Sequence, residues 1–397
     1  MKEEFKILKE NLETIVDDVK KSKNDKDSLA NKVLIRPHDK PDPDAISSAI
    51  ALSTELRKYN TESIILFHRE SPFYENQALH NLLDLKTTSR ITRLGTLKKN
   101  LGEEEFEKAI SSINNSILVD TSTIYPSSLD YKFTKPKLII DHHNGNHTQF
   151  ETATSIVPDS GANISFILAY MLEQGLDINL PEHQALKVSS YIGIETDTSG
   201  FMPELMRDLD RDMKSYLDMH LTDEDKILIE KVKSPEINRN VKRLYGDALK
   251  NHSTYRDDKL VIYAIPNVVK DGAIIPYVTD RFFREDKLGK AIVVFGICDY
   301  TEDDVRYLEL MASGRSLDPS MHMPELFEET FYLKGPEGKR QKYSGGSSIS
   351  QTGISRAGAT IPLHEYEEYP ETDLEKLWEI EQTKYTNRIL KKFPKED

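Results

Sequence analysis

Cysteine is almost absent from this chain, which holds a single one, Cys298, among 397 residues. One thiol excludes an internal disulfide framework and any cysteine-rich zinc site. The chain also lacks any run of about 18 apolar residues, and residues 1–18 carry charges throughout. These absences argue against a membrane-spanning helix and a signal peptide, so the sequence predicts a cytoplasmic protein without a membrane partner.

Positive charge is also in short supply, because 53 Lys and Arg residues face 67 Asp and Glu residues and leave a formal net charge of −14. Proteins that bind long duplex DNA neutralise its phosphates with Lys and Arg, so such DNA is not an expected partner. A short anionic substrate stays compatible with an acidic chain if a local metal site reverses the charge. The length and the 38% apolar fraction predict two or three domains with their own cores.

Short apolar runs recur along the first half of the chain, and each ends at a polar residue. They lie at 32–37, 62–68, 116–120 and 137–141. Helical segments are predicted at 43–59, 161–175, 181–194 and 203–219. Apolar runs of this length with helices between them indicate a parallel sheet that is buried on both faces.

A second apolar series follows a charged stretch that is typical of a helical connector. Its runs are longer, richer in aromatics and partly alternating, which predicts a mixed sheet; they lie at 260–266, 291–298, 305–315 and 329–335. We therefore expect an α/β protein with a mainly parallel N-terminal sheet and flanking helices, a smaller C-terminal mixed α/β domain, and a cleft between them. The predicted parts are a helical extension (1–31), a first domain (32–221), a helical linker (222–255), a second domain (256–365) and a C-terminal helical extension (366–397) with a helix near 371–392.

Potential metal ligands follow three of the predicted strands and one apolar helix. They are His38, Asp42 and Asp44 after the first run, Asp120 after the third, Asp141, His142 and His143 after the fourth, and Asp197 after the helix. Ligands bind at the carboxyl ends of the strands in open parallel sheets, so these side chains are expected to meet. So many carboxylates in one crevice repel each other unless metal ions neutralise them.

Each part of this set has a simpler explanation when taken alone. Asp120 resembles a helix cap or turn residue, residues 38–45 resemble a Pro-Asp turn, and His142-His143 resembles a solvated loop. The conjunction of all four stretches, each after an apolar run, favours a metal site. Oxygen and imidazole donors favour Mn²⁺, Mg²⁺ or Fe²⁺, and a set of about seven groups is sufficient for two ions that clamp a phosphate.

The four stretches also resemble a known family. The segment from His38 to Asp44 (HDKPDPD) is similar to the first motif of the DHH phosphoesterases, and ILVD120 to the second. The triplet Asp141-His142-His143 resembles the third motif and GIETD197T the fourth, in the order of the RecJ-like and oligoribonuclease-like branch. The later stretch with Gly345, Gly346 and RAG358 resembles the Gly-rich loop of the DHH-associated substrate domain, although Ser347 stands where that loop usually has His.

The resemblance implies roles for individual residues. His38, Asp42 and Asp120 would hold one metal ion, and Asp44, Asp120, His142 and Asp197 would hold the other. His143 would face the substrate phosphate, and Asp141 would orient a ligand from behind, so that Asp120, Asp141 and His143 form the catalytic group. In the second domain, the far phosphate or base of the substrate would be bound by Arg315, Ser316, Gly345, Gly346 and Arg356.

The resemblance implies a hydrolase that cleaves phosphodiesters with a hydroxide activated by two divalent ions, most naturally Mn²⁺. Its substrates would be short nucleotides: oligoribonucleotides, linear or cyclic dinucleotides, or bis-phosphorylated adenosine. The alternatives are a pyrophosphate or polyphosphate hydrolase, a processive single-strand exonuclease, and a nucleotide-binding sensor that has lost turnover. A homodimer is a further expectation from the family.

Overall fold

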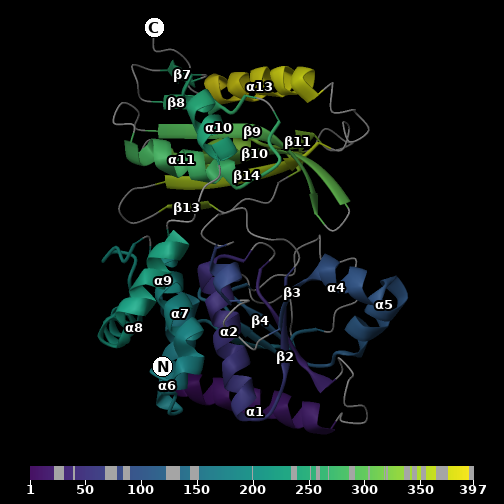
Figure 1. Ribbon diagram of the computed structural model, residues 1–397, viewed down its shortest axis with the longest axis vertical. Coiled ribbons are helices and arrows are strands. Elements are labelled where there is room, and N and C mark those ends of the chain that lie inside the picture. The colour runs from purple at the N-terminus through teal and green to yellow at the C-terminus, as the bar shows by residue number, and fades with distance from the viewer. Residues whose placement is uncertain are drawn as a thin grey trace. The chain divides into compact units, whose positions relative to one another are not determined.

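The computed structural model describes most of the chain, which divides into two compact units (Figure 1). The described residues are 1–21, 31–38, 41–67, 78–83, 90–121, 135–143, 152–198, 200–233, 239–250, 252–255, 260–266, 268–285, 291–302, 305–316, 318, 321–334, 340–341, 347–349, 355–363 and 374–392. The first unit consists mainly of Met1–Ser71 and Glu75–Pro235, and the second mainly of Glu236–Asp397. No helix in the described ranges combines the length and the apolarity needed to cross a membrane.

The first unit is built on a six-stranded sheet in which every pair of neighbours is parallel. Its order is β3-β2-β1-β4-β5-β6. The strands are β1 (Val33–Arg36), β2 (Ser63–Phe67), β3 (Arg90–Arg93), β4 (Ser116–Val119), β5 (Leu138–Ile140) and β6 (Thr154–Ile156). All residues of β1, β4 and β5 are buried, as expected for strands covered on both faces. The predicted parallel sheet is confirmed, and β3 and β6 extend it at its two edges.

Helices cover this sheet and supply the rest of its core. They are α1 (Lys2–Lys21), α2 (Pro43–Lys58), α4 (Leu94–Leu101), α5 (Glu103–Ser112), α6 (Asn163–Glu173), α7 (Gln184–Asp197), α8 (Asp208–His220) and α9 (Asp223–Lys233). One core cluster joins α1, α2, α6 and α7 to the sheet, and a smaller cluster joins α4 and α5 to it. Helix α1 belongs to the main core, because its Phe5 ring lies 5.2 Å from Phe166 and 5.8 Å from Tyr170, centroid to centroid.

The second unit contains a mixed sheet, in the order β13-β14-β10-β9-β8-β7. Only the β8–β9 pair is parallel among the pairs described for this sheet. Its strands are β7 (His252–Tyr255), β8 (Leu260–Ala264), β9 (Ala291–Glu302), β10 (Val305–Ser316), β13 (Ser347–Ile349) and β14 (Ser355–Pro362). The helices are α10 (Arg239–Lys250), α11 (Ile274–Glu285), α12 (Met323–Thr330) and α13 (Leu374–Lys391). Together the two units confirm the predicted α/β fold class.

Asp197, predicted to follow its helix, is instead the last residue of α7. Three further segments differ in detail from the sequence expectation. The predicted strand 329–335 starts in the last turn of α12, and only Leu333–Lys334 forms a strand, β11, paired with β12 (Arg340–Gln341). The charged segment 222–255 divides, since α9 packs on α7 in the first unit and α10 packs on β8 in the second. Helix α13 contributes Leu374, Leu377 and Tyr385 to the core of the second unit, so it is an integral part of that unit.

Candidate metal centre

The predicted ligands gather at the carboxyl ends of the central strands of the first unit. Strand β1 lies between β2 and β4, so the chain leaves β1 toward one edge of the sheet and later leaves β4 toward the other. This is a topological switch point, where loops diverge and leave room for a ligand. His38 follows β1 by two residues, Asp120 directly follows β4, and Asp141 directly follows β5.

The start of helix α2 determines the orientation of two carboxylates in the site. Asp42 is the N-cap of α2, and its Oδ1 accepts a hydrogen bond from the Ala45 N–H at 3.0 Å, with Pro43 at the first helical position. Asp44 lies in the first turn of the same helix and is fully buried. Asp120 has a positive φ of 55°, a left-handed conformation that Asp adopts more readily than most residues.

One group of ligand atoms forms around His38. The His38 Nε2 atom lies 3.8 Å from Asp42 Oδ2 and 3.7 Å from Asp120 Oδ2. One atom from each of these three side chains lies within 4.8 Å of the others, a spacing that one cation can bridge. Burial alone would lower the pKa of His38, but Asp42 and Asp120 outweigh it and raise that pKa to about 9.

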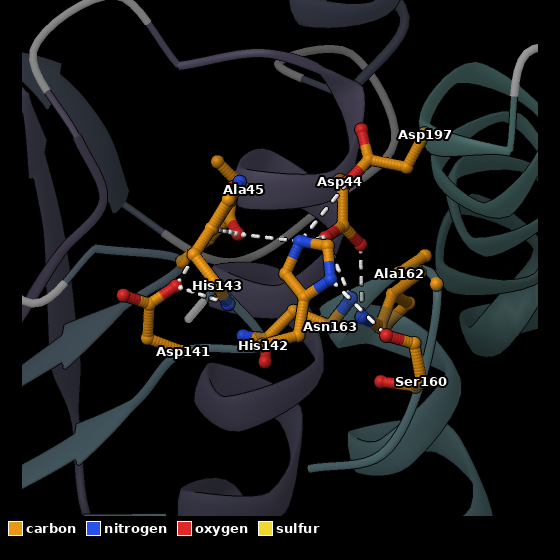
Figure 2. A network of polar contacts seen from close by, with 12 residues as sticks. Asp44, Ala45, Asp141, His142, His143, Ser160, Ala162, Asn163 and Asp197 are labelled. Atoms are coloured by element: carbon orange, nitrogen blue, oxygen red, sulfur yellow. Dashed lines mark hydrogen bonds and ion pairs between the residues drawn. The ribbon is translucent and has the colours of Figure 1, made fainter. Parts of the chain in front are cut away.

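A second group forms around His142. Its Nε2 lies 3.2 Å from Asp197 Oδ2, 3.4 Å from Asp120 Oδ1 and 4.0 Å from Asp44 Oδ2. Figure 2 shows Asp44, His142 and Asp197 turned toward one another. Two further sets have one ligand atom from each side chain within 4.8 Å of the others: Asp44, His142 and Asp197, and Asp120, His142 and His143. Asp120 and His142 therefore each belong to two ligand groups.

The electrostatics of this cluster fit a cation. Burial and the neighbouring Asp197 and Asp120 carboxylates raise the pKa of Asp44 well above its usual value. Burial and the carboxylate of Asp42 likewise raise the pKa of Asp197 to about 6. Two buried atoms, Asp120 Oδ1 and His142 Nε2, have no hydrogen-bond partner in the described structure. Buried polar atoms are normally satisfied, so this pair of atoms and the crowded carboxylates suit metal coordination.

His143 and Asp141 form a separate pair beside the cluster. The His143 Nδ1 atom lies 2.8 Å from Asp141 Oδ1, and the His143 backbone N–H donates to the same oxygen at 3.2 Å. The His143 side chain is 61% exposed, whereas Asp141 is buried. The hydrogen bond with Asp141 raises the pKa of His143. The ring is thus held in one orientation at the open side of the site.

Backbone groups of the turn before α6 and of its first residues hold two of the ligands, and the sequence contains no signal for them. The Ser160 carbonyl lies 3.2 Å from His142 Nδ1, so an Nδ1–H donor leaves Nε2 as the ligand atom. The Asn163 and Ile164 N–H groups donate to Asp44 Oδ2 and Oδ1 at 2.7 and 2.8 Å (Figure 2). These partners are main-chain atoms, which no residue type identifies.

A close contact between helices supports the same region. A Cβ atom on Gly193 of α7 would lie 3.2 Å from the Cα of Asp44 and 3.2 Å from the carbonyl oxygen of Pro43. The absent side chain therefore lets α7, which carries Asp197, pack tightly against the first turn of α2. A glycine inside a helical pattern is the sequence signal for such an approach.

The structure describes only some of the substrate-binding residues that the sequence predicts in the second unit. Arg315 is 7% exposed, and its Nε donates to Oδ1 of the partly exposed Asp280 at 2.8 Å, so an ion pair already engages it. Arg315 pairs with Arg356, and Ser316 with Ser355, across the antiparallel β10–β14 ladder. Gly345 and Gly346 lie outside the described residues, and Ser347 is described only as the first residue of β13.

Comparison with known proteins agrees with this geometry. The pattern of the DHH family, N-terminal domain, matches residues 32–194. An uncharacterized protein of Methanocaldococcus jannaschii, MJ1633, is 25% identical over 299 residues, which are 75% of this chain and 55% of that protein. This chain therefore spans little more than half the length of that relative.

Solved structures are similar over nearly the whole chain. The exopolyphosphatase-related protein from Bacteroides fragilis matches with a TM-score of 0.55 and 17% identity, over 95% of this chain and 97% of that one. The exonuclease RecJ bound to manganese matches with a TM-score of 0.40 and 14% identity, over 96% of this chain and 93% of that one. Residues 32–194, which match the N-terminal domain of the DHH family, include β1, β4 and β5 and the ligands His38, Asp120 and His142, so the family resemblance and the ligand cluster fall in the same part of the chain.

Proposed function

We propose that the protein is a divalent-metal-dependent phosphodiesterase that hydrolyses short nucleotide substrates. Members of the DHH family are metal-dependent phosphoesterases. The observation that carries the proposal is the meeting of Asp44, Asp120, His142 and Asp197, from four distant stretches of chain, at one end of the parallel sheet.

The proposed metal ligands are the side chains that the structure brings together. His38, Asp42 and Asp120 would hold one ion, and Asp44, Asp120, His142 and Asp197 would hold the other, so that Asp120 is shared. When bound, such a pair of ions supplies an activated water and Lewis-acid stabilisation of the phosphoryl oxygens. Mn²⁺ is the first choice and Mg²⁺ or Fe²⁺ the next, because all of the donors are oxygen or imidazole nitrogen.

His143 has a role of its own in this proposal. Its exposed ring stands at the edge of the ligand cluster, and Asp141 favours its protonated form. A protonated imidazole there donates a hydrogen bond to a non-bridging phosphate oxygen, where negative charge grows in the transition state. Asp141 holds the orientation of that ring through Oδ1. In the second unit, Arg315, Ser316 and Arg356, with the Gly345-Gly346 loop, are proposed to contact the distant part of the substrate.

The net charge of −14 favours a small substrate, because a long nucleic acid needs many basic contacts. A second candidate is hydrolysis of pyrophosphate or polyphosphate. It is supported by the similarity to the exopolyphosphatase-related protein from Bacteroides fragilis, which extends over both units.

A substrate panel separates these candidates. Purified protein with Mn²⁺ is offered RNA and DNA of two to ten residues, cyclic dinucleotides, bis-phosphorylated adenosine, pyrophosphate and polyphosphate, and the products are separated by chromatography. We expect nucleoside monophosphates from the short RNA, and no product when a chelator removes the metal. Orthophosphate from pyrophosphate or polyphosphate alone would favour the second candidate. Binding of a nucleotide without any product would contradict both and indicate a sensor.

A further inference from the structure

A fully buried carboxylate outside the ligand cluster holds the turn that supports it. Asp210 lies in the first turn of α8 and is 0% exposed. Its Oδ2 accepts hydrogen bonds from the Gly161 N–H at 2.5 Å and the Arg207 N–H at 2.7 Å, and its Oδ1 accepts one from the Ala162 N–H at 3.2 Å. The bond to Arg207 is an ordinary helix cap. The two others leave the helix and reach residues 48 and 49 positions away in sequence.

The turn that Asp210 holds is the one that orients two ligands. The residue before Gly161 is Ser160, whose carbonyl faces His142 Nδ1. The residue after Ala162 is Asn163, whose N–H, with that of Ile164, holds the Asp44 carboxylate. The Asn163 side chain also donates to the Ile140 carbonyl at 3.1 Å, which ties the turn to the end of β5. A displacement of this turn therefore moves the partners of both ligands.

Packing leaves the turn little freedom to shift. A Cβ atom on Gly161 would lie 2.5 Å from the Leu205 carbonyl oxygen and 2.7 Å from Asp210 Oδ2. Glycine is thus required for the backbone to approach the carboxylate this closely.

We propose that Asp210 is a positioning residue of the metal centre, which fixes the turn 160–164 and through it the orientation of His142 and Asp44. This inference rests on the proposed metal site and adds a residue that makes no contact with the ion or the substrate. Replacing a residue that hydrogen-bonds to a metal ligand typically lowers metal affinity or activity by about 10-fold to 100-fold. Asp210 acts through one turn of backbone, so the expected effect is about tenfold.

The chain offers a matched control in Asp225. It is also 0% exposed, lies in the first turn of α9, and accepts the N–H of the residue three positions before it, Thr222, at 2.9 Å. Its remaining partners are Lys187 at 2.6 Å and Gln184 at 3.0 Å, near the start of α7. Lys187 is about 15 Å along the helix from Asp197 by the rise of an α-helix. Asp225 therefore shares the burial and capping role of Asp210 but lacks its link to the turn.

The test measures Mn²⁺ binding by isothermal titration calorimetry in Asp210→Asn, Asp225→Asn and the unchanged protein, with folding checked by circular dichroism. Asparagine keeps one acceptor oxygen and cannot satisfy all three N–H groups. We expect Asp210→Asn to weaken Mn²⁺ binding about tenfold and Asp225→Asn to leave it within about threefold.

Equal weakening in both variants, or none in Asp210→Asn, would overturn the positioning role. If Asp210→Asn does not fold, Gly161→Ala replaces it, since the added methyl group displaces the same turn, and unchanged affinity there would overturn the role as well. Absence of Mn²⁺ binding in the unchanged protein would instead contradict the proposed function.

Discussion

Replacing Asp120 by Asn is expected to lower kcat/KM for the short-nucleotide substrate by about 1,000-fold. Asp120 lies within reach of both His38 and His142, at 3.7 and 3.4 Å, and is the proposed shared ligand. Its loss weakens the binding of both ions at once. A 1,000-fold decrease in kcat/KM corresponds to about 4 kcal/mol of lost transition-state stabilisation. Steady-state hydrolysis assays in Mn²⁺ measure the effect.

Asp299→Asn is the matched control for this variant. Asp299 is a buried aspartate of the second unit, 2% exposed, and it pairs with Arg306 at 2.8 Å and Lys270 at 2.9 Å. Loss of either carboxylate removes a buried charge from its charged partners, but only Asp120 belongs to the ligand cluster. We expect the control to keep kcat/KM within a few-fold. More than about a tenth of the original activity in Asp120→Asn would rule out the shared-ligand role.

The second large effect is expected for His143→Ala, with kcat about 100-fold lower and the Mn²⁺ content unchanged. The reason is its position, because the ring is 61% exposed and is held by Asp141 rather than enclosed among the carboxylates. Groups that donate to the developing charge of a transition state typically contribute a factor of about 100 to 1,000. Single-turnover kinetics and metal analysis of the purified variant measure the two quantities.

His183→Ala is the control for His143→Ala. His183 is a half-buried histidine of the same unit, and its Nδ1 lies 2.7 Å from the Asp177 carbonyl oxygen. We expect full activity from it. A loss of bound Mn²⁺ in His143→Ala would contradict the substrate-facing role and place His143 among the ligands, with Asp120 and His142.

The main elements of the first unit could be predicted because their signals are local. Asp42 and Pro43 mark the start of α2 by the residues that cap and begin helices. Strands β1 and β4 each contain three consecutive apolar residues, which are typical of buried parallel strands. Strand β3, with the sequence RITR, is half basic, and β6 has only three residues, so neither carries such a signal.

Helix α12 shows how a short apolar run misleads. The run 329–335 predicts a strand, yet Met323, Leu326, Phe327 and Thr330 are buried at a helical spacing. Pro324 lies in the first turn of the helix, where proline is tolerated, and the buried residues follow the three- and four-residue spacing of a helix. The run covers only the end of the helix and the short strand after it, so by itself it shows no helical period.

The candidate site was foreseeable as a set of side chains, since ligands follow strands at one edge of a sheet. The groups that hold these side chains in place could not be foreseen. Ser160 and Ile164 act through backbone atoms that every residue has, and Asp210 reaches the site across 49 residues of sequence. Only the folded chain brings such partners together.

Anomalous diffraction at the manganese edge, from crystals grown with Mn²⁺, tests the central claim most directly. The account predicts two peaks about 3.5–4 Å apart. One peak should contact His38, Asp42 and Asp120, and the other should contact Asp44, His142, Asp197 and the shared Asp120. Crystals that bind Mn²⁺ elsewhere, with no peak among these side chains, would contradict the account.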